Sequence, residues 1–412
     1  MSKTLYPQQQ AAFNSFFDFI ADRDAQTFVI EGYAGTGKST LVKHLLDELP
    51  KLVEAWRTID PSYPDYEISL TSTTHKAVEN LKQISGQYAC TIHSFLGLRL
   101  STDYKTGATS LYPSKNFSLP IEHIVVVDEA GQMTKEMIEH LFNRTKRCKF
   151  LLMGDPAQLV DFKTNTAPVF SAGYPTAKLT DVIRNGGQIL ELATACRNWV
   201  NTGVTPSITP SGTDIVWMDQ DDFNAEIAKE FSRSDWKPSD SSFLAYTNAR
   251  VIEYNNFIRG VAKGDPDFQV GDDANVNEYY VDKTTGKNFK TDQSVVITAI
   301  EPGEENGLVG KYYTIDGTKA FKPDSLKEWR KAISTARANG EYQLANQMQE
   351  SWIDLRAIYA RTVHKAQGST FKRVFVDLSD LGKCRQVTQL ARLAYVAFSR
   401  PTDQIVMTGD FV

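Results

Sequence analysis

Residues 32–39, Gly-Tyr-Ala-Gly-Thr-Gly-Lys-Ser, have the types and the spacing of a loop that binds nucleotide phosphates. They match the pattern G-x-x-x-x-G-K-S/T at every specified position. Glycines let successive backbone N–H groups turn toward an anion. Lys38 is expected to reach the β- and γ-phosphates, and the hydroxyl of Ser39 to ligate Mg²⁺. The loop therefore predicts that the chain binds a nucleoside triphosphate.

An acidic pair downstream supplies the residue types that phosphoanhydride hydrolysis needs. The apolar run 124–127 ends at Asp128 and Glu129, as a strand buried on both faces ends at a site. Asp128 is predicted to hold Mg²⁺ through its water shell, and Glu129 to orient or deprotonate the attacking water. Because acids often follow strands, this assignment depends on the phosphate loop upstream.

Three further polar residues are candidates for the same site. Gln158 follows an apolar run that ends in Gly-Asp-Pro, from where it is expected to sense the γ-phosphate. The alternative for this segment is a plain strand-to-loop turn. Arg184 and Arg400 are candidates for the arginine that neutralises charge on the transferring phosphoryl group. Each arginine taken alone is more typical of a surface or ion-paired residue.

The elements that must position these residues follow from hydrophobic spacing. A strand-like run, Thr27 to Ile30, precedes the loop, and an amphipathic helix with its N-terminus toward the phosphates follows it. Alternation of such strands and helices predicts an α/β fold with two units of parallel sheet and crossover helices. A Thr-, Ser-, Gly- and Pro-rich insertion suggests a hairpin, and a second insertion combines β-like runs of a small barrel with helices. The predicted boundaries are 1–96 and 121–185 for the first unit, 97–120 for its insertion, 186–259 and 352–412 for the second unit, and 260–351 for its insertion.

Composition narrows the class of protein. The 412 residues are 41% hydrophobic and 23% charged, which is ordinary for a globular protein. We expect no signal segment at the N-terminus, and no membrane span, because no stretch approaches the length of apolar sequence that a span requires. The four cysteines are far apart and lack metal-binding spacing, which predicts free thiols in a reducing compartment, the cytoplasm. A formal charge of −5 excludes a bulk electrostatic binder of nucleic acid, so any strand must be held in a local groove.

The ordered motifs resemble those of a superfamily 1 helicase, and more narrowly of its 5′→3′, RecD/Dda-like branch. The segments that carry the resemblance are Leu5–Phe13, GYAGTGKST (32–40), TSTTHKAVENL (71–81), TIHSFL (91–96), VVVDEA (125–130), MGDPAQL (153–159), LTDVIR (179–184), FLAYTNARVIEYNNFIR (243–259), TVHKAQGST (362–370) and AYVAFSRPTD (394–403). A single short motif is weak evidence, but this set covers nearly the whole chain. The 5′→3′ polarity is an analogy that depends on the TIHSFL-like segment and on overall similarity.

The resemblance implies two RecA-like P-loop domains with ATP and Mg²⁺ in the cleft between them. The catalytic residues that it implies are Lys38, Asp128, Glu129, Gln158, Arg184 and Arg400, with Ser39 and Asp128 at the metal. The nucleotide-binding residues that it implies are Gln9, as a reader of adenine, and Gly32, Ala34, Gly35, Thr36, Gly37, Lys38, Ser39, Thr40 and Gly368.

The resemblance also implies that one DNA strand lies across both domains. Hydroxyl, amide and short basic groups would contact phosphates without reading sequence, and only a few are needed in a chain of acidic charge. The candidates are Thr73, His75, Lys76, Thr91, His93, Asn248, His364 and Lys365. The alternatives are a structural histidine at 93 and a solvated helix lysine at 76.

The insertion at 97–120 falls where relatives carry a hairpin, the pin, that separates the duplex. Leu111 and Tyr112 are its predicted tip, because an aromatic face can stack on the last base pair. The alternative packs Tyr112 locally against Phe117.

The leading prediction is an ATP-dependent DNA helicase that moves 5′→3′ on single-stranded DNA and unwinds forked duplexes as a monomer, in phage replication or recombination. A single-strand-binding protein or other replication proteins are the expected partners, and no membrane is. One alternative is a helicase that remodels RNA or RNP with the same pair of ATPase domains. Contacts with the 2′-hydroxyl would distinguish an RNA substrate from DNA. Another is a nucleotide-gated single-strand-binding switch without translocation. Motifs at 362–370 and 394–403 argue against the switch, because a switch needs no second arginine-bearing lobe.

Overall fold

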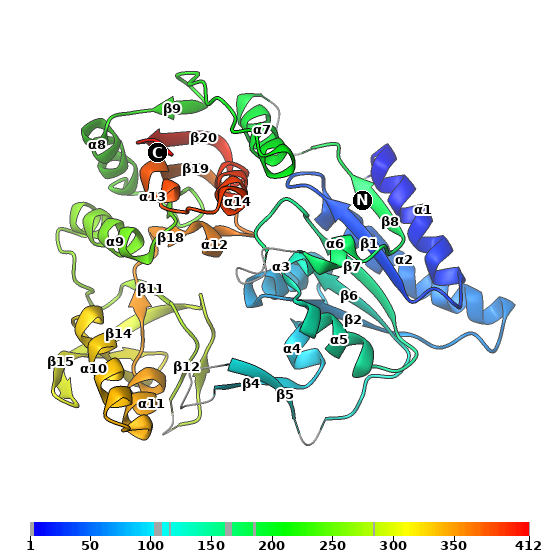
Figure 1. Ribbon diagram of the computed structural model, residues 1–412, viewed down its shortest axis with the longest axis horizontal. Coiled ribbons are helices and arrows are strands. Elements are labelled where there is room, and N and C mark those ends of the chain that lie inside the picture. Colours follow the sequence, from blue (N-terminus) through cyan, green and yellow to red (C-terminus); the bar gives the residue numbers. More distant parts are fainter. Residues whose placement is uncertain are drawn as a thin grey trace.

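The computed structural model describes residues 4–102, 109–114, 117–160, 167–183, 187–282 and 285–411. Two α/β lobes lie side by side, and a third, mainly β module lies below the second lobe (Figure 1). A hairpin of β4 (Leu98–Thr102) and β5 (Thr109–Pro113) extends from the first lobe toward this β module. Over the described residues, no helix combines the length and the apolar character that crossing a bilayer requires.

The first lobe is built around a six-stranded parallel sheet in the order β3-β2-β6-β7-β1-β8. Its strands are β1 (Thr27–Gly32), β2 (Glu67–Ser72), β3 (Ala89–Thr91), β6 (His123–Asp128), β7 (Lys149–Gly154) and β8 (Thr176–Leu179). Its helices are α1 (Pro7–Ala21), α2 (Lys38–Ile59), α3 (His75–Ser85), α4 (Ile92–Phe95), η1 (Ala130–Gln132), α5 (Lys135–Asn143) and α6 (Pro168–Ser171). Ile124 and Val126 pack in one core with α1, α2 and α3, whereas Val125 and Val127 pack in another with α4 and α5. The continuous apolar run of β6 thus serves both faces of the sheet.

The second lobe repeats this plan with a five-stranded parallel sheet in the order β18-β10-β19-β20-β9. Its strands are β9 (Ile215–Trp217), β10 (Ser241–Ala245), β18 (Ala360–Thr362), β19 (Phe371–Asp377) and β20 (Pro401–Thr408). Its helices are α7 (Gln188–Thr202), α8 (Gln220–Phe231), α9 (Asn248–Lys263), α12 (Val363–Ala366), α13 (Leu378–Gly382) and α14 (Val387–Phe398). One face packs against α7, α13 and α14, and the other against α8 and α9.

The β module is an antiparallel sheet in the order β16-β15-β14-β11-β17, with a short hairpin of β12 and β13. Its strands are β11 (Asp273–Val276), β12 (Tyr280–Val281), β13 (Asn288–Phe289), β14 (Ser294–Glu305), β15 (Leu308–Ile315), β16 (Thr318–Pro323) and β17 (Leu355–Arg356). Trp352 bridges to Phe321 in the edge strand β16, three residues before β17 pairs with β11. One segment therefore joins both edges of the sheet into a barrel-like module, beside which α10 (Leu326–Ala338) and α11 (Tyr342–Ser351) pack.

The predicted α/β fold class, with two parallel sheets, a hairpin insertion and a barrel-like and helical insertion, is confirmed. The predicted tip of the hairpin is wrong. Leu111 and Tyr112 lie within β5, opposite Leu100 and Arg99, because an apolar and an aromatic residue favour a strand ladder over a turn. Phe117 packs under Arg144, with its ring centroid 4.7 Å from the guanidinium carbon, and its contact with Tyr112 stays a prediction.

Replacing Lys149 with methionine is expected to lower the free energy of unfolding by about 1–3 kcal/mol, because three carbonyls lose a charged donor. Nζ of this buried side chain donates to the carbonyl oxygens of Phe19 (3.1 Å), Asp22 (2.5 Å) and Ala25 (2.7 Å), at the end of α1 and just beyond it. Urea denaturation of both proteins measures the change. Lys51→Met is the control, since its 69% exposed side chain makes only a surface pair with Glu48. Equal losses in the two variants would contradict this role for Lys149.

Candidate active site between the two lobes

One cleft, with a volume of about 1630 Å³, lies where the two lobes and the β module meet. The first lobe lines it with the glycine loop, α3 and the carboxyl end of β6, and the second lobe with segment 368–371 and Arg400. Ligands of α/β proteins bind at such carboxyl ends of parallel strands. The predicted site residues that line this cleft are Ala34, Gly35, Gly37, Lys38, Ser39, Thr40, His75, Lys76, Asp128, Glu129, Gln158, Lys365, Gly368 and Arg400.

The glycine loop is folded around its lysine. Gly35 and Gly37 have φ of 81° and 76°, in the left-handed region that favours glycine, and α2 begins at Lys38 directly after them. Nζ of Lys38 donates to the carbonyl oxygens of Gly32 and Tyr33, the latter at 3.1 Å. A phosphate that replaces these carbonyls meets a cation already in position.

Gln9 lies beneath the loop and braces its backbone. Nε2 donates to the carbonyl oxygens of Thr36 (3.2 Å) and Gly37 (3.1 Å), and Oε1 accepts from the backbone N–H of Tyr6 at 3.0 Å. A Cβ at residue 37 would lie 2.4 Å from this Nε2, so the glycine is needed for close approach as well as for its φ. The structure thus assigns Gln9 a structural contact with the loop, and its reading of adenine stays a prediction.

The acidic pair lies at the end of β6 with a strained backbone. Glu129 has a φ of 54°, which is uncommon for a residue with a side chain, and its N–H donates to Oδ1 of Asp128 at 2.9 Å. Burial raises the pKa of Asp128, against the opposing charge of Lys38. Burial, followed by the charge of Asp128, raises the pKa of Glu129 to about 7. A carboxyl group with a pKa near neutrality suits a general base.

A magnesium ion fits this donor set. The carboxylate of Asp128 and the hydroxyl of Ser39 are oxygen ligands on the same cleft. Within the described ranges, no group of three or more His, Cys, Asp and Glu side chains could hold a metal by itself. Phosphate and water oxygens would have to complete the coordination, as is usual for Mg²⁺.

The second lobe adds an arginine and a glycine to the cleft. Arg400 is buried, and its guanidinium donates to the carbonyl oxygen of Ser369 (3.2 Å) and the hydroxyl of Ser399 (2.8 Å). Gly368 has a φ of 75°, and its carbonyl oxygen accepts from Nδ2 of Asn80 on α3 at 3.3 Å. The other candidate arginine, Arg184, lies outside the described residues.

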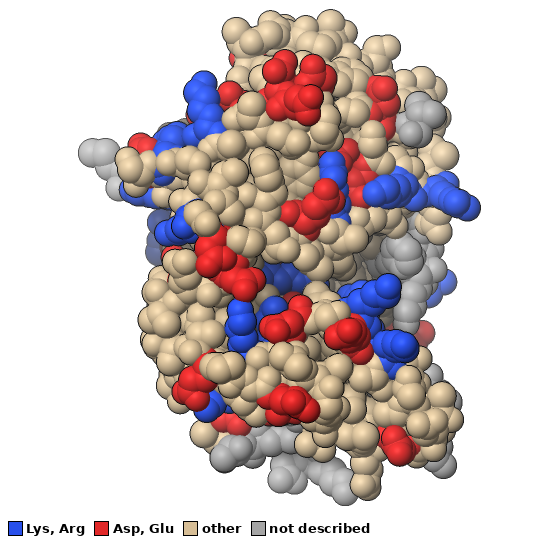
Figure 2. All heavy atoms as spheres, turned by 90° about the vertical axis from the view of Figure 1, so that its left-hand side faces the viewer, with Lys and Arg blue, Asp and Glu red and all other residues tan. Residues whose placement is uncertain are grey.

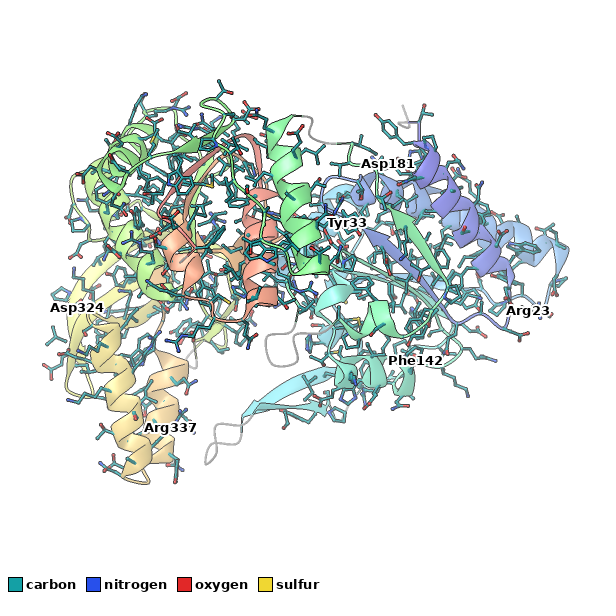
Figure 3. The ribbon with its side chains drawn as sticks, turned by 45° about the horizontal axis from the view of Figure 1, so that its top comes forward. Arg23, Tyr33, Phe142, Asp181, Asp324 and Arg337 are labelled. Atoms are coloured by element: carbon teal, nitrogen blue, oxygen red, sulfur yellow. The ribbon has the colours of Figure 1, made fainter. Side chains whose placement is uncertain are left out.

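Two of the interlobe contacts that the sequence did not predict lie at the acidic pair and at the glycine loop. Nε2 of Gln367 donates to Oε2 of Glu129 at 3.1 Å, so the second lobe holds the candidate base. The guanidinium carbon of Arg197 on α7 lies 4.0 Å from the ring centroid of Tyr33, which Figure 3 shows beside α7. The only sequence signal for Gln367 is its place in the motif 362–370, because its partner lies 238 residues away.

The strand-binding candidates divide into those that meet across the cleft and those that do not. Lys76 on α3 contacts the hydroxyl of Ser369 and the carbonyl oxygen of Lys365, so it is not a solvated helix lysine, and burial lowers its pKa to about 7. Nζ of Lys365 pairs with Asp292 of the β module at 2.8 Å. Burial lowers the pKa of both His75 and His93, and the charge of His75 adds to the shift at His93.

The remaining candidates make local contacts. Thr73 donates to the carbonyl oxygen of Glu129 at 3.2 Å, and Thr91 caps α4 through the N–H of Ser94. Oδ1 of Asn248 accepts from Arg356 at 2.7 Å, and His364 is exposed beside Tyr246. Their contacts with a strand stay predictions. Acidic and basic side chains are interspersed on the face that bears the second lobe and the β module (Figure 2).

Two protein-family models match the chain: an AAA domain at residues 4–205 and a UvrD-like helicase C-terminal domain at residues 357–408. The chain is 26% identical to the ATP-dependent DNA helicase dda of Enterobacteria phage T4, over 89% of this chain and 91% of that protein. It is 21% identical to an uncharacterized protein of Acanthamoeba polyphaga mimivirus, over 97% and 98% of the two chains.

Solved structures of Pif1 helicases share the fold. The Bacteroides Pif1 helicase in complex with ADP-AlF3 and single-stranded DNA aligns with a TM-score of 0.52 at 15% identity, over 100% of this chain and 93% of that chain. The Candida albicans Pif1 helicase aligns with a TM-score of 0.50 at 14% identity, over 99% and 94% of the two chains. At these identities, the likeness concerns the arrangement of lobes and modules alone.

Replacing Gly32 with alanine is expected to raise the Kd for ATP about tenfold or more, since a charged contact with phosphate is lost. The new Cβ would lie 2.7 Å from Cγ of Lys38 and displace the lysine. Titration with a fluorescent ATP analogue measures the change. Gly260→Ala in α9 is the matched control, because nothing lies within 4 Å of a Cβ there. If both variants bind ATP as tightly as the wild type, packing against Gly32 is not what positions Lys38 for phosphate binding.

Proposed function

We infer that this chain, which belongs to the superfamily 1 helicases of the Pif1 and Dda type, is an ATP-dependent DNA helicase. One observation carries this function. The glycine loop and acidic pair of one lobe line the same cleft as a buried arginine of the other lobe. A nucleotide there touches both lobes at once, so its binding and hydrolysis change the relation between them.

Each side chain of the cleft has a chemical task in this function. Lys38 neutralises the β- and γ-phosphates, and Arg400 neutralises charge that develops on the phosphoryl group during transfer. Glu129 takes the proton of the attacking water or orients that water. Asp128 and Ser39 would hold Mg²⁺, which supplies further neutralisation of the phosphates when bound.

The strand contacts are proposed for the residues that meet across the cleft. Lys76 lies at the start of α3 in the first lobe, and Lys365 lies on α12 in the second. A single strand that contacts both lobes is gripped and released as the cleft opens and closes. Contacts of this kind with phosphates do not depend on base sequence.

The direction and the substrate complete the proposal. Movement is 5′→3′, on forked DNA, by a single copy of the chain. The TIHSFL segment (91–96) and the resemblance of the ordered motifs to the 5′→3′ branch support this direction. The Bacteroides Pif1 structure with single-stranded DNA, and a Pif1 structure that concerns unwinding at forked duplex DNA by two coordinating helicases, support DNA as the partner. The RNA remodeller and the switch without translocation are outcomes of the following test.

The test compares ATP-dependent unwinding of duplexes that carry only a 5′ tail or only a 3′ tail, in DNA and in RNA. We expect unwinding of the 5′-tailed DNA. Lys38→Ala is expected to bind single strands with unchanged affinity and to unwind none, because the phosphate contact that drives closure is lost. Unwinding from the 3′ tail alone would overturn the direction, unwinding of RNA alone would favour the remodeller, and none on any substrate would favour the switch.

Tyr112→Ala is expected to reduce unwinding about tenfold while single-stranded DNA still stimulates ATP hydrolysis, because loss of base stacking affects only strand separation. Tyr112 is 43% exposed on β5, where its ring can meet a base. A gel assay of forked duplex and a coupled ATPase assay measure the two activities. Tyr88→Ala, which removes an exposed tyrosine outside the hairpin, is the control. Unchanged unwinding by the Tyr112 variant would place strand separation elsewhere.

A further inference from the structure

The carboxylate of Asp155 is the centre of a buried hydrogen-bond network between the lobes. Oδ1 accepts from the backbone N–H of Ala157 at 2.9 Å. Oδ2 accepts from Nε2 of Gln158 at 3.0 Å and from the hydroxyl of Tyr395 at 2.7 Å. Asp155 and Gln158 follow β7 in the first lobe, whereas Tyr395 lies on α14 in the second. Three groups from two lobes therefore meet at one buried side chain.

This network fixes which end of the Gln158 amide is available. A carboxylate only accepts hydrogen bonds, so the NH₂ group of Gln158 must face Asp155. Oε1 is then left over, and among the described residues it is buried without a hydrogen-bond partner. An unsatisfied buried acceptor is costly, and Gln158 lines the nucleotide cleft. The donor that Oε1 lacks is expected to arrive with the nucleotide.

The chemistry of the cleft limits what that donor is. Phosphate oxygens only accept hydrogen bonds, so Oε1 cannot bond to the γ-phosphate. A water molecule beside the γ-phosphate is a donor, and Glu129 lines the same cleft as the candidate base for it. Oε1 of Gln158 therefore cannot make the contact with the γ-phosphate that the sequence predicts for this residue.

The hydroxyl of Tyr395 has a second bond on the nucleotide side. It accepts from the backbone N–H of Ala34, in the glycine loop, at 2.9 Å. One turn earlier on α14, Nη1 of Arg392 donates to the carbonyl oxygens of Pro156 (2.7 Å) and Gln158 (2.6 Å). α14 also leads directly to Arg400. A shift of this helix therefore acts on the loop of Gln158 and on the arginine together.

We propose that Tyr395 is a positioning residue for ATP hydrolysis, which holds Asp155 so that the Gln158 side chain presents Oε1 to the attacking water. The proposal rests on the ATPase activity inferred above. Tyr395 touches neither substrate nor reacting atoms, and acts through two side chains. Loss of its hydroxyl frees one acceptor site on Asp155 and lets the Gln158 amide move, which slows the chemical step and not the binding of ATP.

A double-mutant cycle of Tyr395→Phe and Gln158→Ala tests this route. We expect Tyr395→Phe to lower the kcat of DNA-stimulated ATP hydrolysis about tenfold, with KM for ATP within about twofold. The double variant should be no slower than Gln158→Ala alone, because both changes remove the same function. Tyr63→Phe is the matched control, since it removes a buried hydroxyl that bonds to the carbonyl oxygen of Ile20 at 2.6 Å, away from the cleft.

Three outcomes overturn the proposal: unchanged kcat in Tyr395→Phe, multiplied losses in the double variant, or a raised KM at constant kcat. The last would mean that Tyr395 acts on Ala34 alone. If Tyr395→Phe unfolds at a lower temperature than Tyr63→Phe, Asp155→Asn replaces it in the cycle, with the same non-additivity expected because an amide no longer fixes which end of Gln158 faces it. Wild-type protein without DNA-stimulated hydrolysis would refute the proposed function itself, independently of these variants.

Discussion

The nucleotide cleft lies where the two lobes, each built on a parallel sheet, meet. The first sheet presents the carboxyl ends of its strands to the cleft, whereas the second lobe lines it with residues at the amino ends of β19 and β20. Neither lobe has the whole set of charges that a triphosphate requires. Lys38 and the acidic pair belong to one lobe, and Arg400 belongs to the other. The charge of a bound triphosphate must be neutralised by residues of both lobes. The distance between the lobes therefore depends on whether the nucleotide is bound and whether it has been hydrolysed.

The contacts that already join the lobes combine polar side chains with a small apolar patch, in which Ala157 and Leu159 of the first lobe pack into a core of the second. Gln367 reaches Glu129, Asn80 reaches Gly368, and Tyr395 reaches Asp155. A hydrogen bond of this kind contributes about 0.5–1.5 kcal/mol net, so a nucleotide with differential affinity can outweigh several of them. Most apolar core residues pack within one lobe, on the two faces of its sheet, which favours motion of the lobes as rigid bodies.

An ion pair and hydrogen bonds connect the β module to the second lobe at the same cleft. Nζ of Lys365 on α12 bonds to Asp292 at 2.8 Å and to the carbonyl and side-chain oxygens of Asn277 at 2.7 and 2.8 Å. These three acceptors satisfy the ammonium group of Lys365, whose backbone carbonyl oxygen accepts from Nζ of Lys76. Because α12 also leads into Gln367, the module, the strand-binding candidates and the candidate base are linked over a few residues of backbone.

The two α/β units, the insertions, the glycine loop and the acidic pair can be predicted from the amino-acid sequence, because strand burial, helix spacing and phosphate binding depend on residues that lie close together along the chain. The folded chain was needed to show which end of the Gln158 amide faces the cleft, that Gln9 supports the loop, and that Leu111 and Tyr112 lie in a strand. Tyr395 and its partner Asp155 are 240 residues apart, and neither residue type marks the contact. Such pairings depend on how the two sheets come together, which no local pattern encodes.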